Sequence, residues 1–110
     1  MRRQALYIAA LLLFLTTKLF AQELFDKAAK PILVSRQFTF TEGPAVDKQG
    51  NIFFTDQPNN HIWESDINGK LSVFIDKAGR ANGMYFDTKN NLIACADEHN
   101  QVWQISPNKK

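Results

Sequence analysis

Short apolar stretches alternate with polar turns along most of the chain after residue 30. The stretches are rich in β-branched and aromatic residues and are bounded by Gly, Asn, Asp or Pro, a pattern typical of β-strands. Only residues 22–30 show a helical pattern. The chain is therefore predicted to be all-β. The expected strands cover residues 32–35, 51–55, 61–65, 71–75, 91–95 and 101–105.

The sequence also repeats itself when it is shifted by forty positions. Ile52 then falls on Leu92, and Ile62 falls on Val102. The identical pairs are Gly43 and Gly83, Asp47 and Asp87, Asn51 and Asn91, Asn60 and Asn100, Trp63 and Trp103, and Asn68 and Asn108. Repeats of about forty residues that hold three or four short strands are typical of β-propeller blades rather than of a sandwich.

The turns fit this architecture and help to divide the chain. Residues 47–50 and 66–69 each begin with Asp and end with Gly, which favours hairpin turns. An EF-hand calcium loop is the weaker reading, because the carboxylates it needs farther along are absent. We predict two blades, residues 38–77 and 78–110, after a lead-in with a closing strand at residues 22–37.

Three side chains have simple structural interpretations. Trp63 and Trp103 recur at equivalent positions, and a repeated aromatic more often packs blade against blade than it stacks on a sugar. Cys95 is the single cysteine, so no intrachain disulfide can form. It lies in an apolar run and is expected to be a small buried hydrophobe.

The first 21 residues have the pattern of a secretory signal peptide. A basic start is followed by an apolar run at residues 5–17 and by Ala21 before the predicted cleavage point. The run is shorter than the roughly twenty residues of a membrane-spanning helix. We therefore predict a signal peptide at residues 1–21, a periplasmic or secreted protein, and no stable membrane span after cleavage. An uncleaved anchor is the alternative.

The charge balance excludes one class of partner. The chain has 13 basic and 11 acidic residues. Three of the basic residues, Arg2, Arg3 and Lys18, lie in the predicted signal peptide, and the others are spread along the chain, where Lys109 and Lys110 alone are adjacent. The basic patch expected of a nucleic-acid binder is therefore missing. Small molecules or proteins are the expected partners.

Candidate site residues emerge from the repeat. The shift of forty carries Glu42 onto Asn82, and each precedes a Gly at the start of a repeat. The innermost strand of a blade begins there, and these strands line the channel of a propeller. A carboxylate and an amide oxygen suit calcium or magnesium, whereas zinc prefers His and Cys. A metal at this place would activate water for hydrolysis without an activated Ser or Cys.

Several motifs carry a family resemblance: FTEGP, DKQGNIFFTD, NNHIW, ANGMYFD and NLIAC. On these motifs, residues 38–105 resemble the gluconolactonase and regucalcin family. The resemblance implies a six-bladed propeller with a divalent metal in its channel and a lactone hydrolase activity on sugar lactones. It implies that Glu42 is a metal ligand and that Asn82 contacts substrate or metal. Calcium is the expected cofactor, with magnesium or zinc as alternatives, and the catalytic residues stay unassigned.

The length limits what the chain does alone. Six blades of about forty residues need roughly 240 residues, and the chain has 110. We expect the N-terminal part of a lactone hydrolase whose remaining blades are missing from this chain, so that the chain by itself is inactive. Three alternatives stay open: three copies close one ring, the propeller is a non-catalytic binding module, or the chain is an inactive truncated product.

Overall fold

The computed structural model describes residues 26–107. These belong to two units, divided after Leu33, which are considered separately. The predicted signal peptide lies outside the described residues. Within the described part, no helix is long and apolar enough to cross a membrane.

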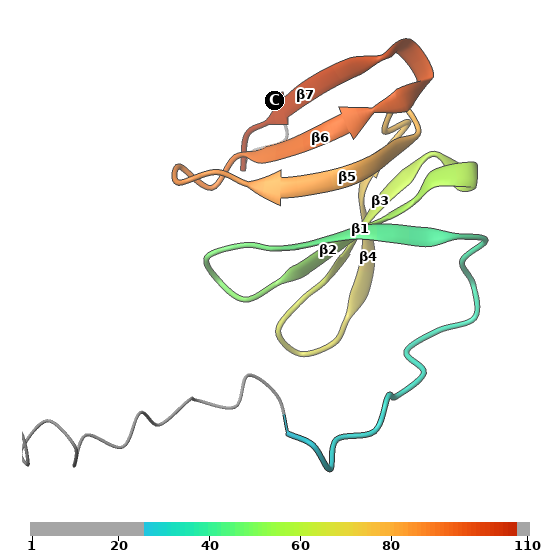
Figure 1. Cartoon of the computed structure of the whole chain (residues 1–110), viewed down its shortest axis with the longest axis vertical. Helices are drawn as coiled ribbons and strands as arrows, with labels where there is room; N and C mark the ends of the chain where they lie inside the picture. Colours follow the sequence, from blue (N-terminus) through green and yellow to red (C-terminus); the bar gives the residue numbers. More distant parts are fainter. Residues whose placement is uncertain (1–25, 108–110) are drawn as a thin grey trace, which may run out of the picture. The chain divides into compact units, whose positions relative to one another are not determined.

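Residues 34–107 contain two antiparallel sheets, which fan out from each other in Figure 1. The first sheet has the strand order β1-β2-β3-β4 and the second has the order β5-β6-β7. Two single-turn 3₁₀ helices, η1 (Gln57–Asn59) and η2 (Asp97–His99), occupy equivalent places in the two sheets. The strands are β1 (Thr41–Val46), β2 (Ile52–Asp56), β3 (His61–Ser65), β4 (Leu71–Asp76), β5 (Ala81–Phe86), β6 (Leu92–Ala96) and β7 (Gln101–Ile105). The predicted all-β fold is confirmed.

The same Asp–Asn pair closes the first hairpin of each sheet. Asp47 accepts the backbone N–H and the side-chain amide of Asn51, both at 2.9 Å. Asp87 accepts the same two groups of Asn91 at 2.8 Å. The Asn91 side chain, followed by its backbone N–H, holds the pKa of Asp87 below its ordinary value. The resulting stabilisation is present above the ordinary pKa and is lost as the pH falls through the lowered one.

The turn between β3 and β4 is a hairpin turn, as predicted. The Asp66 carboxylate accepts the backbone N–H groups of Asn68 and Lys70 at 2.8 and 2.9 Å. The bond from Lys70 is the main cause of a lowered pKa at Asp66. Gly69 takes the left-handed conformation, with φ of +80°, that lets the chain reverse.

Each sheet has two different faces, and the repeat identifies them. The leading face of the first sheet includes Phe53 and Ile62, which are 4% and 0% exposed and belong to the shared core. The forty-residue shift makes Ile93 and Val102 the leading face of the second sheet. The trailing faces are the opposite ones. They include Ile52, Phe54 and Trp63 in the first sheet and Leu92, Ala94 and Trp103 in the second.

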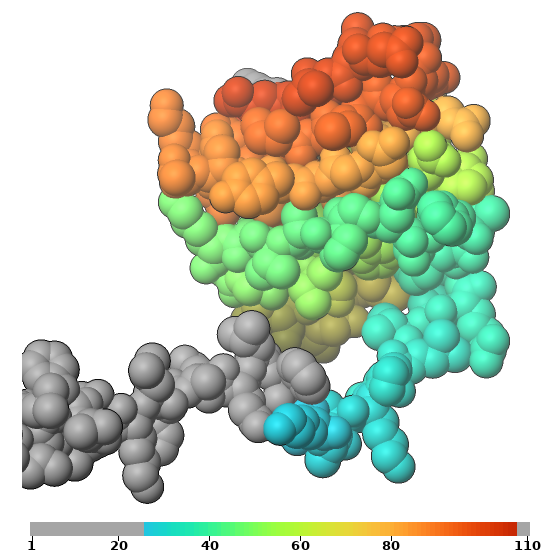
Figure 2. Space-filling model, in the orientation of Figure 1, coloured from blue at the N-terminus to red at the C-terminus, as the bar shows by residue number. Residues whose placement is uncertain are grey.

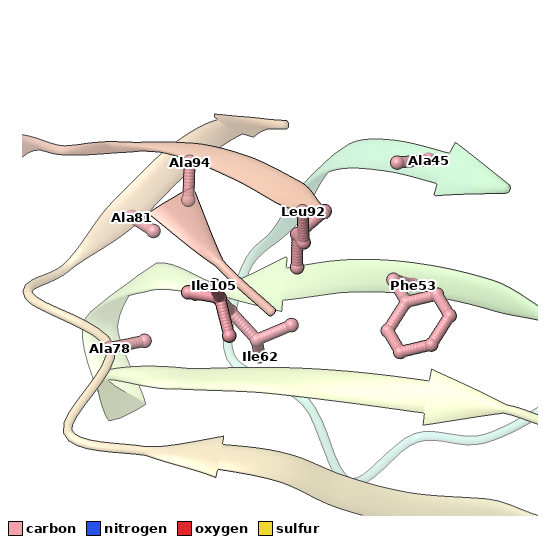
Figure 3. Packing of buried hydrophobic residues seen from close by; sticks show 8 residues of the cluster. All are labelled: Ala45, Phe53, Ile62, Ala78, Ala81, Leu92, Ala94 and Ile105. Atoms are coloured by element: carbon pink, nitrogen blue, oxygen red, sulfur yellow. The ribbon is translucent and has the colours of Figure 1, made fainter. Parts of the chain in front are cut away.

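One core joins the two sheets, because the leading face of the first packs on the trailing face of the second. Figure 3 shows the buried cluster. The Phe53 ring meets the edges of Phe74 and Phe86 at centroid distances of 4.9 and 5.0 Å. In Figure 2 the second sheet, orange, lies directly on the first, green. The cluster comprises Ala45, Phe53, Ile62, Ala78, Ala81, Leu92, Ala94 and Ile105.

The two tryptophans pack differently although the repeat makes them equivalent. Trp103 packs against the shared core and over Gly79, so its predicted role between blades is confirmed. Trp63 lies on the trailing face of the first sheet, where its ring meets Phe38 edge-on at 5.3 Å. Phe38 occupies the repeat position of Ala78, and this larger side chain covers Trp63.

Two expectations were wrong, and the closing strand stays a prediction. Residues 32–35 form no strand in the described part of the chain, and the last blade, with which a closing strand would pair, is missing from this chain. In the predicted helical segment, the described residues form a turn in which Ala29 donates its N–H to the Asp26 carbonyl oxygen at 3.0 Å. Cys95 is exposed rather than buried, because it lies on the leading face of the second sheet, which residues 26–107 leave uncovered.

Candidate functional site

The first strands of the two sheets, β1 and β5, lie side by side (Figure 1). Both have an irregularity in register near their start, at overlapping but not identical repeat positions. Pairing with the next strand shifts between Glu42 and Ala45 in β1, and between Ala81 and Met84 in β5. A bulge bends its strand and changes the direction of the side chains around it. Glu42 therefore lies at the edge of the irregular stretch in β1, and Asn82 lies within the one in β5.

The two strands come very close together at Gly43, directly after Glu42. Gly43 has a φ of +58°, and a Cβ atom added there would lie 1.8 Å from the carbonyl oxygen of Asn82. Such a contact is impossible for any residue with a side chain, so the Gly of FTEGP is required by geometry. Its repeat partner Gly83 has no such constraint, since an added Cβ would meet Cys95 Sγ at 3.8 Å.

Thr55 joins the two strands from within the core. Its side chain is fully buried, at 0% exposure. The hydroxyl donates to the carbonyl oxygen of Glu42 at 3.0 Å and lies 3.5 Å from that of Asn82. The sequence analysis did not assign this residue. The signal that could have revealed it is a polar residue in the apolar run of β2, at the position where β6 has Cys95.

Asp56 is a second buried polar residue that the sequence analysis did not assign. It is 1% exposed. Its carboxylate accepts the backbone N–H groups of Thr39 and Phe40, both at 3.2 Å, and the side-chain amide of Asn59 at 2.8 Å. These bonds satisfy the buried carboxylate and fix the chain where it enters β1. Ala96 stands at the equivalent position, so this anchor belongs to the first blade alone.

The Glu42 and Asn82 side chains, both half-buried, differ in how they are engaged. Within residues 26–107, the Glu42 carboxylate has no hydrogen-bond or ion-pair partner. The Asn82 side-chain oxygen accepts the backbone N–H of Gly83 at 2.6 Å. The structure therefore brings the two backbones together and leaves one carboxylate free beside their point of contact.

The side-chain oxygens of Glu42 and Asn82 are ligands that suit a hard divalent cation, but two residues are too few to complete a site. Calcium takes six to eight oxygen ligands. Residues 26–107 contain no group of three or more His, Cys, Asp or Glu side chains that could hold a metal ion. Glu42 and Asn82 would therefore supply only part of a calcium site.

Comparisons with known proteins bear on the fold and the family. No protein-family model matches the chain, and no curated protein matches its sequence. Solved structures do match. A gluconolactonase from Xanthomonas campestris superposes with a TM-score of 0.66 at 20% identity, covering 70% of this chain and 26% of that one. A structural-genomics candidate gluconolactonase gives 0.70 at 26% identity, covering 78% and 30%.

A streptogramin B lyase also matches, with a TM-score of 0.58 at 15% identity over 64% of this chain and 24% of that one. The chain thus spans 24–30% of the length of these three proteins. The two sheets are propeller-type blades, and the resemblance to gluconolactonases is confirmed by the structural matches.

The two repeat-equivalent glycines give a direct test of the contact between β1 and β5. Gly43→Ala is expected to lower the free energy of unfolding by about 3 kcal/mol, because the backbone of β5 must move away. Gly83→Ala is expected to stay within about 1 kcal/mol of the wild type. Urea unfolding of the full chain, followed by tryptophan fluorescence, measures both values. Equal effects of the two substitutions would contradict the close approach.

Thr55→Val tests the hydroxyl bridge at nearly constant volume. The substitution removes the bond from the buried Thr55 hydroxyl to the Glu42 carbonyl oxygen, so we expect a loss of about 1 kcal/mol in the free energy of unfolding. Thr88→Val, at an exposed turn position, is the matched control and should change stability by less than about 0.5 kcal/mol. A Thr55→Val chain as stable as the control would show that the bridge contributes nothing.

Proposed function

We propose that a protein containing these two blades is a divalent-metal-dependent hydrolase of sugar lactones. Glu42 is the metal ligand in this proposal, and Asn82 contacts the substrate or the metal. The observation that supports it most directly is the Glu42 carboxylate, which has no hydrogen-bond or ion-pair partner among residues 26–107 and lies beside the contact between the two inner strands. The similarity to gluconolactonase structures supports the class of reaction.

Each residue has a distinct part in the proposed site. Glu42 would hold the cation, which we expect to be calcium, with magnesium and zinc as alternatives. When bound, such a cation polarises a carbonyl and lowers the pKa of coordinated water. The Asn82 amide nitrogen keeps two donors that can bind a lactone oxygen, because only its oxygen is engaged with Gly83. Thr55 holds both backbones in place.

The fold alone does not define the reaction, because one scaffold carries different functions. A non-catalytic propeller that binds a protein or carbohydrate through its loops is therefore the second candidate. The pattern of residues 1–21 supports a periplasmic or secreted location for either function. Metal binding and lactone hydrolysis have to be measured separately to distinguish the two candidates.

Glu42→Gln separates the metal role from the fold. The substitution keeps the size of the side chain and removes its charge, so we expect calcium affinity to fall at least about tenfold. Glu98→Gln, an exposed substitution in η2, is the matched control and should leave the affinity unchanged. Isothermal titration calorimetry measures calcium binding on the complete protein with its remaining blades, because the chain alone is expected to be inactive. Release of acid from glucono-lactone, above the spontaneous rate, measures hydrolysis.

The outcomes distinguish the candidates. Calcium binding that is weakened by Glu42→Gln, together with calcium-dependent hydrolysis, supports the proposal. Calcium binding without hydrolysis favours a binding module or an incomplete catalytic site. Calcium affinity that is equal in the wild type and in Glu42→Gln contradicts the assignment of Glu42 as a ligand.

A further inference from the structure

The backbone that leads into Glu42 is held by a buried carboxylate. Asp56, which is 1% exposed, accepts the backbone N–H groups of Thr39 and Phe40, both at 3.2 Å. The neighbouring Thr55 hydroxyl donates to the carbonyl oxygen of Glu42 itself. The backbone is therefore bonded both before Glu42 and at Glu42, which fixes the point from which its carboxylate projects.

The backbone that leads into Asn82 is held in a similar way by Asn60. The Asn60 side-chain oxygen accepts the backbone N–H of Arg80 at 2.7 Å, and its carbonyl oxygen accepts that of Ala78 at 2.9 Å. Asn60 takes a left-handed conformation, with φ of +60°, at the C-terminal end of η1. Because these bonds run from the first sheet to the loop that enters the second, Asn60 fixes the approach of β5.

The two supports belong to one short segment. The forty-residue shift places Phe40 on Arg80, so the two supported N–H groups are equivalent, each two residues before a candidate site residue. Their acceptors are not equivalent, because Asp56 and Asn60 lie at the two ends of η1 in the first blade. Ala96 stands at the position equivalent to Asp56 and has no side-chain acceptor. Residues 56–60 therefore support the entries to both inner strands.

We propose that residues 56–60 position the candidate site, with Asp56 setting the place of Glu42 and Asn60 setting the place of Asn82. Neither support contacts a ligand, and each acts through the backbone of the residue that it places. Loss of such supporting groups commonly lowers metal affinity or activity by about 10- to 100-fold. The inference rests on the proposed function for its effects on calcium and lactone, but not for its effects on the two backbones.

Asn60→Gly tests one support against a close control. Glycine keeps the left-handed conformation and removes the side-chain oxygen. Asn90→Gly makes the same change at φ of +65°, where the Asn90 oxygen also accepts a backbone N–H from the other sheet, that of Lys48 at 3.0 Å. Asn90 lies in the β5–β6 turn, at the other end of β5 from Asn82. Both variants lose a bond between the sheets, but only Asn60→Gly loses it near the site.

The kinetic readout uses the complete protein with its remaining blades. With calcium at the wild-type Kd, we expect Asn60→Gly to lower kcat/KM for glucono-lactone about tenfold. Asn90→Gly should leave kcat/KM unchanged, although both variants should lose thermal stability to a similar extent. In an Asn82→Ala background, Asn60→Gly should have no further effect, because Asn60 acts through Asn82. Additive effects, or equal effects of the two glycine variants, would contradict the positioning role.

Asp56→Asn tests the other support. The amide keeps the size of the side chain but replaces one acceptor oxygen by a donor, so the three bonds to the carboxylate cannot all be kept. We expect calcium affinity, measured by isothermal titration calorimetry, to fall about tenfold. Asp66→Asn is the matched control, because the Asp66 carboxylate also accepts two backbone N–H groups, in the β3–β4 turn. Its calcium affinity should equal that of the wild type.

The backbone amide resonances of Gly43 and Gly83 give a readout that needs no ligand. In the calcium-free protein, Asp56→Asn should shift the Gly43 resonance and Asn60→Gly should shift that of Gly83, while the two control variants shift neither. Unchanged glycine resonances in both test variants would overturn the inference. A wild type that neither binds calcium nor hydrolyses lactone would overturn the proposed function instead, and the resonances would still decide the positioning role.

Circular dichroism establishes that each variant is folded. If Asp56→Asn is unfolded, Asn59→Ala replaces it, because this substitution removes only the side-chain bonds to Asp56 and Thr39. The same shift of the Gly43 resonance is expected, and its absence would count against the support of Glu42 by Asp56.

Discussion

The contact between the backbone of Gly43 and the carbonyl group of Asn82 is the constraint on which the arrangement of the two sheets depends. Because Gly43 has no side chain and takes a positive φ, β1 and β5 can approach closely enough for the Thr55 hydroxyl to lie within 3.5 Å of carbonyl oxygens on both strands. The same approach brings the two sheets over one core. Moving β5 away would open that core and separate Glu42 from Asn82, so the fold and the candidate site share one cause.

The local pattern of apolar and turn residues predicted much of this fold, because the strands and hairpin turns depend on residues close in sequence. The strands β2, β3, β4, β6 and β7 follow from alternating apolar positions, and the Asp–Asn turns recur at the repeat distance. The inner strands β1 and β5 were placed only at the start of each repeat, without bounds, and the structure shows that they begin at Thr41 and Ala81. Their bulges tolerate Gly, and β1 also tolerates Pro44, residues that otherwise indicate a strand boundary.

The burial and hydrogen bonding of individual polar residues depend on contacts between distant parts of the chain, which no local pattern contains. Thr55 and Asp56 break the repeat, and only the folded chain shows that both are buried and hydrogen-bonded. The apolar run around Cys95 indicated burial, yet burial on a leading face requires another sheet to cover it. Glu42 and Asn82 were singled out by their register, which does place them on adjacent strands. The roles of their side chains as ligand or substrate contact remain proposals.

The central claim is that β1 and β5 touch at Gly43 and Asn82, and nuclear Overhauser effects between the two strands test it most directly. In the labelled full chain, the account predicts strong effects between the Gly43 α-protons and the α-protons of Asn82 and Gly83. Strong effects within each sheet, between paired strands such as β1 and β2, serve as the internal standard. Their presence without any effect between Gly43 and residues 82–83 would contradict the account.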